Sequence, residues 1–342
     1  MPTPQQYKLP LKSRISFLYL ERGKLEQKEN SLFFKNSKGA VQLPVANIAT
    51  IILGPGTSAS HAAMRLICSS GCTVCWSYSG GLQLSATGSE NNRSSRNLLK
   101  QAQASMSASK REAVAIRMYN FRFPDQPLPE AMTDLTGNST SSIDKASDDK
   151  AHNSVDENPN RYSLAQLRGK EGLRVRSAYS NLAEEHGIVW SGRRYGEGQE
   201  TTLINQTISL TNSCLYAIVE AALHQLGYSP ALGFVHSGSM RSFVYDVADL
   251  FKLDVSLPAA FRAVSECPDT AAGKSRYLLR EHLHEHKALQ RLPTILDDLL
   301  YFPEDASEEE DDTIQLPDQS GEVIWDLNEY LNIGINHDSD PG

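Results

Sequence analysis

The stretch TLINQTISLTNSCLYAIVEAALHQLG, residues 202–227, decides the fold class of the C-terminal part of the chain. Its large apolar residues recur every three or four positions, which is the period of an amphipathic α-helix. Gly227 ends the pattern, as a glycine commonly does just beyond a helix C-terminus. The sequence therefore predicts one long helix over 202–226.

Other helical patterns lie on both sides of this one. Ser163 precedes Gln166 by three residues, which is the spacing of a capping box at a helix start. The further predicted helices are Leu98–Phe121, Ser163–His186, Phe243–Lys252, Pro258–Val264 and Ser275–Tyr301.

The N-terminal part reads as short strands separated by glycine-containing turns. Ile15, Phe17 and Tyr19 occupy alternate positions, the period of a β-strand. Further strand patterns are Ser31–Phe34, Val41–Val45, Ala49–Leu53, Thr73–Tyr78 and Leu82–Ser85. One helical pattern, Ser58–Ser69, interrupts them, with Ser60 as its cap. We therefore expect an α+β multidomain protein, with an N-terminal β-sandwich followed by an all-α domain.

We place the β domain at residues 1–97, the helical domain at 98–302 and an acidic tail at 303–342. Residues 126–160 are rich in Ser, Asp, Asn and Pro, so they predict a flexible insertion that cannot form a core. The tail is similarly polar, apart from an apolar island around Val323–Leu327.

The formal net charge of −8 is unevenly distributed. Residues 301–342 contain 13 Asp and Glu and no Lys or Arg, so the remainder of the chain is net positive. The acidic total therefore does not exclude nucleic acid as a partner. No long uncharged apolar run and no secretory pattern occurs, so we expect no membrane span and a cytoplasmic protein.

Five cysteines are present, two of them as Cys72-x-x-Cys75. A second pair at zinc-ribbon spacing is missing, and this pair lies in an apolar strand pattern. We therefore expect buried, reduced thiols.

Three segments carry residues suited to chemistry. Glu171 lies early on a predicted helix, and His236 lies in a loop flanked by glycines. Asp246 and Asp249 stand three residues apart on an otherwise apolar helix, where a buried carboxylate needs a cation or hydrogen-bond donors. Each pattern is also typical of structural residues, so spacing alone leaves both interpretations open.

Several segments together resemble the CRISPR-associated integrase family (the Cas-one family), and its type I-E branch in particular. The resemblance runs through both predicted domains in one order. The segments that carry it are Pro10–Arg14, Gly54–Thr57, Ser60–Leu66, Leu167–Arg176, Ser191–Tyr195, Ile204–Gln206, Ser213–Tyr216 and Gly233–Asp249.

That resemblance implies a metal-dependent DNA integrase and endonuclease, which joins the 3′-hydroxyl ends of captured DNA to a CRISPR repeat. It implies that Glu171, His236 and Asp249 are metal ligands and catalytic residues, with Asp246 as a supporting catalytic residue. Two carboxylates and an imidazole suit Mg²⁺ or Mn²⁺.

The resemblance also implies double-stranded DNA as substrate, a homodimer, and a small ferredoxin-fold partner in a four-to-two complex. The tail segment Val323–Leu327 is a candidate to add as a strand to that partner's sheet. Relatives often have a lysine at Ser239, and Arg241 is the candidate to replace it. Basic residues around the site are the candidate DNA contacts: Arg65, Arg93, Arg96, Arg241, Lys252, Arg276 and Arg280.

Two other functions remain open on the sequence alone. A non-catalytic DNA-capture scaffold would need no metal ligands, and the presence of Glu171, His236 and Asp249 argues against it. A repair nuclease for branched DNA would share the active site, so only its products distinguish it from an integrase.

Overall fold

The computed structural model describes residues 14–78, 81–86, 95–129, 164–193 and 202–303. Residues 1–300 form one compact unit. The second unit, 301–342, is described only at 301–303. The predicted tail strand and most of the predicted insertion therefore lie outside the described residues.

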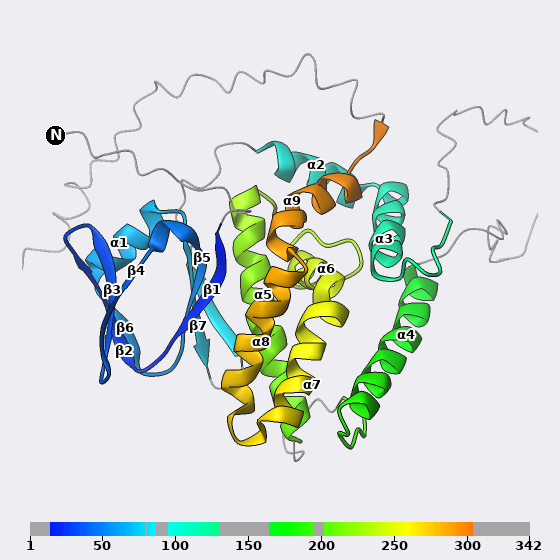
Figure 1. The fold of residues 1–342 in the computed structure, drawn as a ribbon. Coiled ribbons are helices and arrows are strands. Elements are labelled where there is room, and N and C mark those ends of the chain that lie inside the picture. Colours follow the sequence, from blue (N-terminus) through cyan, green and yellow to red (C-terminus); the bar gives the residue numbers. More distant parts are fainter. Residues whose placement is uncertain (1–13, 79–80, 87–94, 130–163, 194–201, 304–342) are drawn as a thin grey trace, which may run out of the picture. The chain divides into compact units, whose positions relative to one another are not determined.

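The N-terminal part contains two four-stranded sheets (Figure 1). The first has the order β1-β5-β7-β8, over Ile15–Leu20, Ile48–Leu53, Thr73–Tyr78 and Gly81–Ala86. Its first three strands are parallel, and β8 is antiparallel to β7. The second has the order β4-β3-β2-β6, over Gly39–Leu43, Ser31–Asn36, Gly23–Lys28 and Thr57–Ala59.

One hydrophobic core lies between these sheets. Leu25 and Leu32 of the second sheet belong to the same buried cluster as Ile51 and Val74 of the first. Helix α1, His61–Ser69, packs on this cluster, and its N-cap Ser60 accepts the backbone N–H of Ala63 at 3.2 Å. The predicted β-sandwich and the predicted cap are confirmed.

The sequence patterns missed strands β2 and β6. In β2 only Leu25 is buried, and its neighbours Lys24 and Glu26 are polar, so no apolar alternation marks the strand. Pairing with β3 on one side and β6 on the other defines it instead.

The rest of the unit is helical, as predicted. Helix α5, Leu203–Leu226, has more buried residues than any other described helix and contacts α6, α7 and α8. Gly227 ends it with φ +79°, a left-handed conformation that glycine adopts freely. The other helices are α2 (Arg96–Met106), α3 (Ala108–Arg122), α4 (Leu164–Glu185), α6 (Ser242–Phe251), α7 (Leu257–Glu266), α8 (Ala271–Glu285) and α9 (Ala288–Leu299).

Two predicted helices are each two helices in the structure. Ser107 divides the predicted helix Leu98–Phe121 because its backbone is extended. Its hydroxyl accepts the N–H of Lys110 and so caps the N-terminus of α3. Lys287 divides Ser275–Tyr301 because it adopts a left-handed conformation, with φ +49°. Hydrophobic periodicity continues across both breaks, so it could not reveal them.

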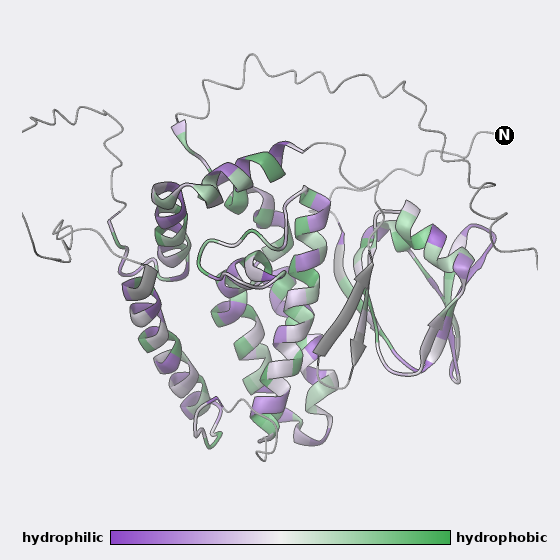
Figure 2. Cartoon of the chain, turned by 180° about the vertical axis from the view of Figure 1, so that it is seen from behind, coloured by the Kyte–Doolittle hydropathy of each residue, from purple (hydrophilic) through white to green (hydrophobic). Residues whose placement is uncertain are grey.

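The β and α parts contact each other within the first unit. Helix α5 packs against β5 and β8, and the Gln225 side chain donates to the Ala49 carbonyl at 3.3 Å. The Arg276 guanidinium lies 3.8 Å from the centre of the Tyr19 ring. Hydrophobic colour is concentrated in the central helices, while α4 is more hydrophilic (Figure 2).

The predicted thiols are buried and reduced. Cys72, Cys75 and Cys214 are buried and free, and burial raises the pKa of Cys75 to about 12. No helix in the described part of the chain is long and apolar enough to cross a membrane.

Gln101 of α2 fixes the loop that leads to His236. Its amide donates to the carbonyls of Ser229 and Leu232 at 2.9 and 2.8 Å and accepts the N–H of Ser229 at 2.8 Å. Because the side chain is fully buried, no water replaces these bonds once they are lost.

We predict that Gln101→Leu lowers the free energy of unfolding by about 2 kcal/mol, since it leaves three partly buried backbone groups, two of Ser229 and one of Leu232, without this partner. The shift of the urea midpoint measures the effect. Gln103→Leu on the exposed face of the same helix is the matched control and should change little. Equal shifts for the two variants would contradict the role of Gln101.

Candidate active site

A buried carboxylate organises the loop before α6. Asp246 is fully buried, and its oxygens accept the backbone N–H groups of Phe234, Val235 and His236 at 2.6, 3.1 and 2.8 Å. Three such bonds satisfy a charge that would otherwise be costly to bury. Asp246 therefore fixes the backbone that presents His236.

Close packing restricts the same loop to a glycine at position 233. A Cβ there would lie 2.6 Å from the His236 carbonyl oxygen and 2.9 Å from Oδ2 of Asp246. Two arginines hold the loop from outside: Arg111 donates to the Phe234 carbonyl at 2.9 Å, and Arg168 donates to the Val235 carbonyl.

His236 is oriented by Asp246. Its Nδ1 lies 2.7 Å from Oδ1 of Asp246, and its side chain is 43% exposed. The hydrogen bond to Asp246 raises the pKa of the imidazole above its usual value. With Nδ1 donating to the carboxylate, Nε2 is the ring atom that could bind a metal, an arrangement common among metal-binding histidines.

Asp249 lies one helical turn beyond Asp246 and forms an ion pair with Lys252. Lys252 begins a π-helical turn, Lys252–Ser256, that directly follows α6. Burial alone would lower the pKa of Lys252, but Asp249 and Tyr216 outweigh it and hold the pKa above its usual value. Lys252 is therefore a stable cation beside Asp249.

Hydrogen bonds fix this π turn in place. The Ser256 hydroxyl, which is fully buried, donates to Oδ1 of Asn212 on α5 at 2.7 Å. The Nδ1 of His282 lies 3.1 Å from the Val255 carbonyl. This contact gives His282 a structural role, whereas the nearby His284 and His286 are exposed.

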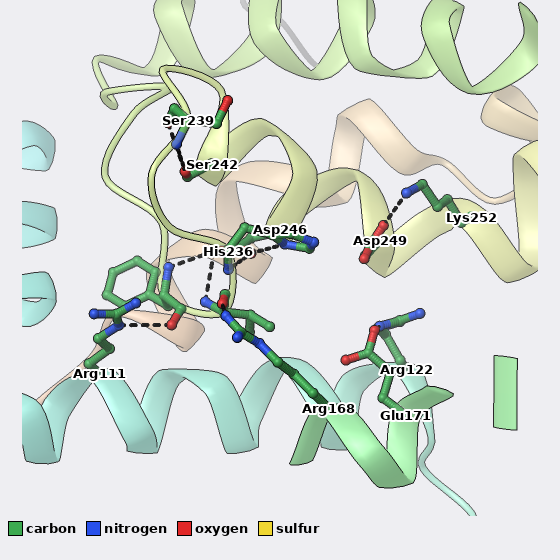
Figure 3. A network of polar contacts seen from close by, with 12 residues as sticks. Arg111, Arg122, Arg168, Glu171, His236, Ser239, Ser242, Asp246, Asp249 and Lys252 are labelled. Carbon is green, nitrogen blue, oxygen red and sulfur yellow. Dashed lines mark hydrogen bonds and ion pairs between the residues drawn. The ribbon is translucent and has the colours of Figure 1, made fainter. Parts of the chain in front are cut away.

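Glu171 comes from α4 and pairs with an arginine that the sequence analysis did not single out. Arg122, the last residue of α3, forms an ion pair with Oε1 of Glu171. The Arg122 side chain is 7% exposed and that of Glu171 is 20% exposed. Figure 3 shows this pair next to the pair of Asp249 and Lys252.

Glu171, His236, Asp246 and Asp249 line one cavity of about 20 Å³. That volume admits roughly one water-sized sphere, which suits a single ion rather than an organic cofactor. Within the described residues, no three acidic, histidine or cysteine side chains lie close enough to form a complete metal shell. The donor set fits a hard divalent cation, but the carboxylates of Glu171 and Asp249 are each paired with a positively charged side chain.

A larger cavity of about 510 Å³ is also lined by Glu171 and Asp249. Its walls also carry Arg122 and Lys252, together with Arg176, Trp190 and Arg193. Trp190 stacks on Tyr179 at 5.1 Å between ring centres, and Arg193 is fixed by hydrogen bonds to Asn205 and Ser209. The carboxylates of Glu171 and Asp249 thus border a groove that is lined by positively charged side chains.

Two of the predicted DNA contacts lie near this site. Lys252 lines the groove, as described above. Arg241 forms an ion pair with Glu220 at 2.8 Å and lies over the rings of Tyr216 and Tyr245. Arg241 is therefore already engaged by the protein, although it stands only a few residues from His236.

Four other predicted DNA contacts do not line the two cavities around Glu171. Arg65 is exposed on α1, Arg96 begins α2, and Arg276 packs on Tyr19. Arg280 lines a separate cavity of about 370 Å³. Arg93 lies outside the described residues.

No sequence pattern predicted that Arg122 and Arg193 would line this groove. Arg122 stands among aromatic residues just before the insertion, and no spacing links it to Glu171, 49 residues further on. Arg193 lies in Ser191–Tyr195, one of the segments that carry the family resemblance. A charged residue inside an aromatic run was the one available signal for Arg122.

Comparison with known proteins gives consistent results. A family model described as CRISPR associated protein Cas1 matches residues 18–266. The CRISPR-associated endonuclease Cas1 2 of Thermus thermophilus is 35% identical over 334 residues, covering 96% of this chain and 92% of the relative. The CRISPR-associated endonuclease Cas1 of Escherichia coli K12 is 34% identical over 295 residues, covering 85% of this chain and 87% of the relative.

A solved structure described as a TtCas1–DNA complex superimposes with a TM-score of 0.69 at 35% identity. The match covers 84% of this chain and 92% of that one. Taken with the family model, these relatives show that the chain belongs to the Cas1 family of CRISPR-associated proteins.

Proposed function

We propose that this chain is a metal-dependent DNA integrase and endonuclease of CRISPR adaptation. The observation that carries the proposal is that Glu171, His236 and Asp249 line one ion-sized cavity beside a positively charged groove. Relatives named CRISPR-associated endonucleases and a relative solved with DNA support the same function. The segments quoted above favour the type I-E branch.

The proposed reaction is a transesterification. The 3′-hydroxyl of a captured DNA fragment attacks a phosphodiester of the CRISPR repeat, so one phosphodiester forms as another breaks. A bound Mg²⁺ or Mn²⁺ would supply Lewis-acid polarisation and neutralise charge on the phosphate. No covalent link to the enzyme is needed.

The chain's own residues have separate tasks in this proposal. Glu171, Asp249 and the Nε2 of His236 would hold the ion. Asp246 is a positioning residue, because its oxygens are taken by three N–H groups and the imidazole. Lys252 and Arg122 would contact DNA phosphates, which provide affinity without sequence information.

Further parts of the proposal concern assembly. By the family resemblance we propose a cytoplasmic homodimer that acts with a small ferredoxin-fold partner on double-stranded DNA. We also retain Arg65, Arg96, Arg276 and Arg280 as DNA contacts in that assembly, away from the metal cavity.

We predict that Glu171→Ala, His236→Ala and Asp249→Ala each lower strand transfer at least a hundredfold, because each removes a metal ligand. The assay incubates a supercoiled plasmid carrying the cognate repeat with a labelled short duplex, the partner protein and Mn²⁺. Label joined to plasmid is the readout.

Matched controls remove the same chemical groups elsewhere. Glu184→Ala on α4 and Asp254→Ala in the π turn are exposed and should retain joining. Joining that survives all three ligand changes would leave the DNA-capture scaffold as the better function. Cutting of branched DNA without joining would favour the repair nuclease.

We predict that Asp246→Asn weakens Mn²⁺ binding by about 10- to 100-fold, the usual effect of losing the group that orients a ligand histidine. The amide cannot accept all the bonds that the carboxylate accepts, so His236 loses its orientation. Calorimetric titration with Mn²⁺ measures the effect. Unchanged affinity in a folded variant would show that Asp246 does not position His236.

A further inference from the structure

Arg122 is buried at the candidate metal site with one of its hydrogen-bond donors unsatisfied. Its guanidinium pairs with Glu171 and is almost completely buried, yet its Nε–H is buried without a hydrogen-bond partner among the described residues. A buried arginine with a purely structural role normally has its donors satisfied. Arg122 therefore has capacity for a further acceptor at this position.

Lys252 forms a similar buried ion pair with Asp249, the other candidate ligand carboxylate. It pairs with Oδ1 of Asp249, an oxygen that is buried and accepts no well-formed hydrogen bond. Its ammonium lies 4.9 Å from the centre of the Tyr216 ring. Asp246, only a turn away from Asp249, differs because it accepts three backbone N–H groups.

The charges of the two ion pairs balance without a metal, and the third carboxylate of the cavity, Asp246, is satisfied by backbone N–H groups and His236. Glu171 and Asp249 contribute two negative charges, and Arg122 and Lys252 contribute two positive charges. A divalent ion bound to the same carboxylates must compete with both pairs. Binding of the ion raises the net charge beside the adjoining groove by two, which favours phosphate there.

We propose that Arg122 and Lys252 are exchangeable counter-cations, which hold the ligand carboxylates in the metal-free protein and transfer to DNA phosphates when the metal binds. The inference rests on the proposed metal site at Glu171, His236 and Asp249. Both cations line the groove that these carboxylates border, so a short side-chain movement delivers them to a strand there.

This exchange couples the metal to the DNA. Metal binding frees the two cations for phosphate, and phosphate removes the cations that compete with the metal. By linkage each ligand strengthens the other by the same factor. The ion pairs therefore weaken metal binding when no DNA is present.

The first test is a titration of the metal-free, full-length protein with Mn²⁺, followed by the electron paramagnetic resonance signal of free Mn²⁺. Arg122→Met should bind Mn²⁺ about tenfold more tightly than the wild type, which corresponds to about 1.4 kcal/mol. Arg122→Lys keeps the charge and should restore an affinity near that of the wild type. Lys252→Met should also tighten binding, and it carries the test if Arg122→Met does not fold.

Arg174→Met is the matched control. Arg174 lies one turn beyond Glu171, but its guanidinium lies over the Phe123 ring at 4.8 Å and its partner is Gln126. Its removal subtracts the same charge without breaking a pair to a ligand carboxylate. Equal effects of Arg122→Met and Arg174→Met, or weaker Mn²⁺ binding by Arg122→Met, would overturn the exchange.

Failure of the metal site itself gives a different result. If wild-type protein shows no saturable Mn²⁺ site, or Glu171→Ala binds Mn²⁺ as the wild type does, then the proposed function loses its metal centre. If the wild type binds Mn²⁺ and Glu171→Ala does not, the metal site is supported. The Arg122 and Lys252 variants then test only the proposed exchange.

The transfer to DNA is read from salt dependence. The affinity for a short, uncleavable duplex would be measured by fluorescence anisotropy over a salt series, in EDTA and in saturating Mn²⁺. Arg122→Met should reduce the slope of log affinity against log salt by about one in Mn²⁺ and leave it unchanged in EDTA. The same reduction under both conditions, or none in Mn²⁺, would contradict transfer of Arg122 to phosphate.

Discussion

The bonds to the buried carboxylate of Asp246 determine the geometry on which the site depends. They join helix α6 to the 234–236 loop through three backbone N–H groups and to His236 through its Nδ1. Such a charge is stable in the interior only when its oxygens are satisfied, so the loop and the helix must form together. The Gly233 backbone approaches too closely for any side chain, and Gln101, Arg111 and Arg168 hold the loop from three other helices.

The other two candidate ligands, Glu171 and Asp249, depend on this arrangement less directly. The position of Asp249 is set by its place on α6, one turn beyond Asp246. Glu171 lies on α4, which follows the insertion in the sequence. Glu171 and Asp249 lie beside the same small cavity as Asp246, so their charges need partners when no metal is bound. Arg122 and Lys252 are those partners, and the π turn that carries Lys252 is fixed through Ser256 and Asn212. In the proposed function the same two cations serve the DNA strand in the groove.

Much of this was predictable from sequence, and the omissions have physical causes. The period of the apolar residues predicts α5. The family resemblance predicts the site residues Glu171, His236, Asp246 and Asp249. Strand β2 was not predicted because all its residues except Leu25 and Gly23 are polar, and only its pairing with β3 and β6 defines it. The breaks at Ser107 and Lys287 depend on backbone conformation, to which hydrophobic periodicity is insensitive. Arg122 escaped because its partner is distant in sequence, and ion pairs between helices leave no pattern of spacing.

The central claim is that Glu171, His236 and Asp249 hold one divalent ion. The most direct measurement is the anomalous diffraction of Mn²⁺ in crystals of the full-length protein grown with Mn²⁺, with data collected on both sides of the manganese absorption edge. The account predicts one strong peak in the cavity between these three side chains, with Nε2 of His236 as the nitrogen ligand and Arg122 and Lys252 turned away from the carboxylates. A map without a peak there, or with the ion bound elsewhere while both ion pairs stay intact, would contradict it.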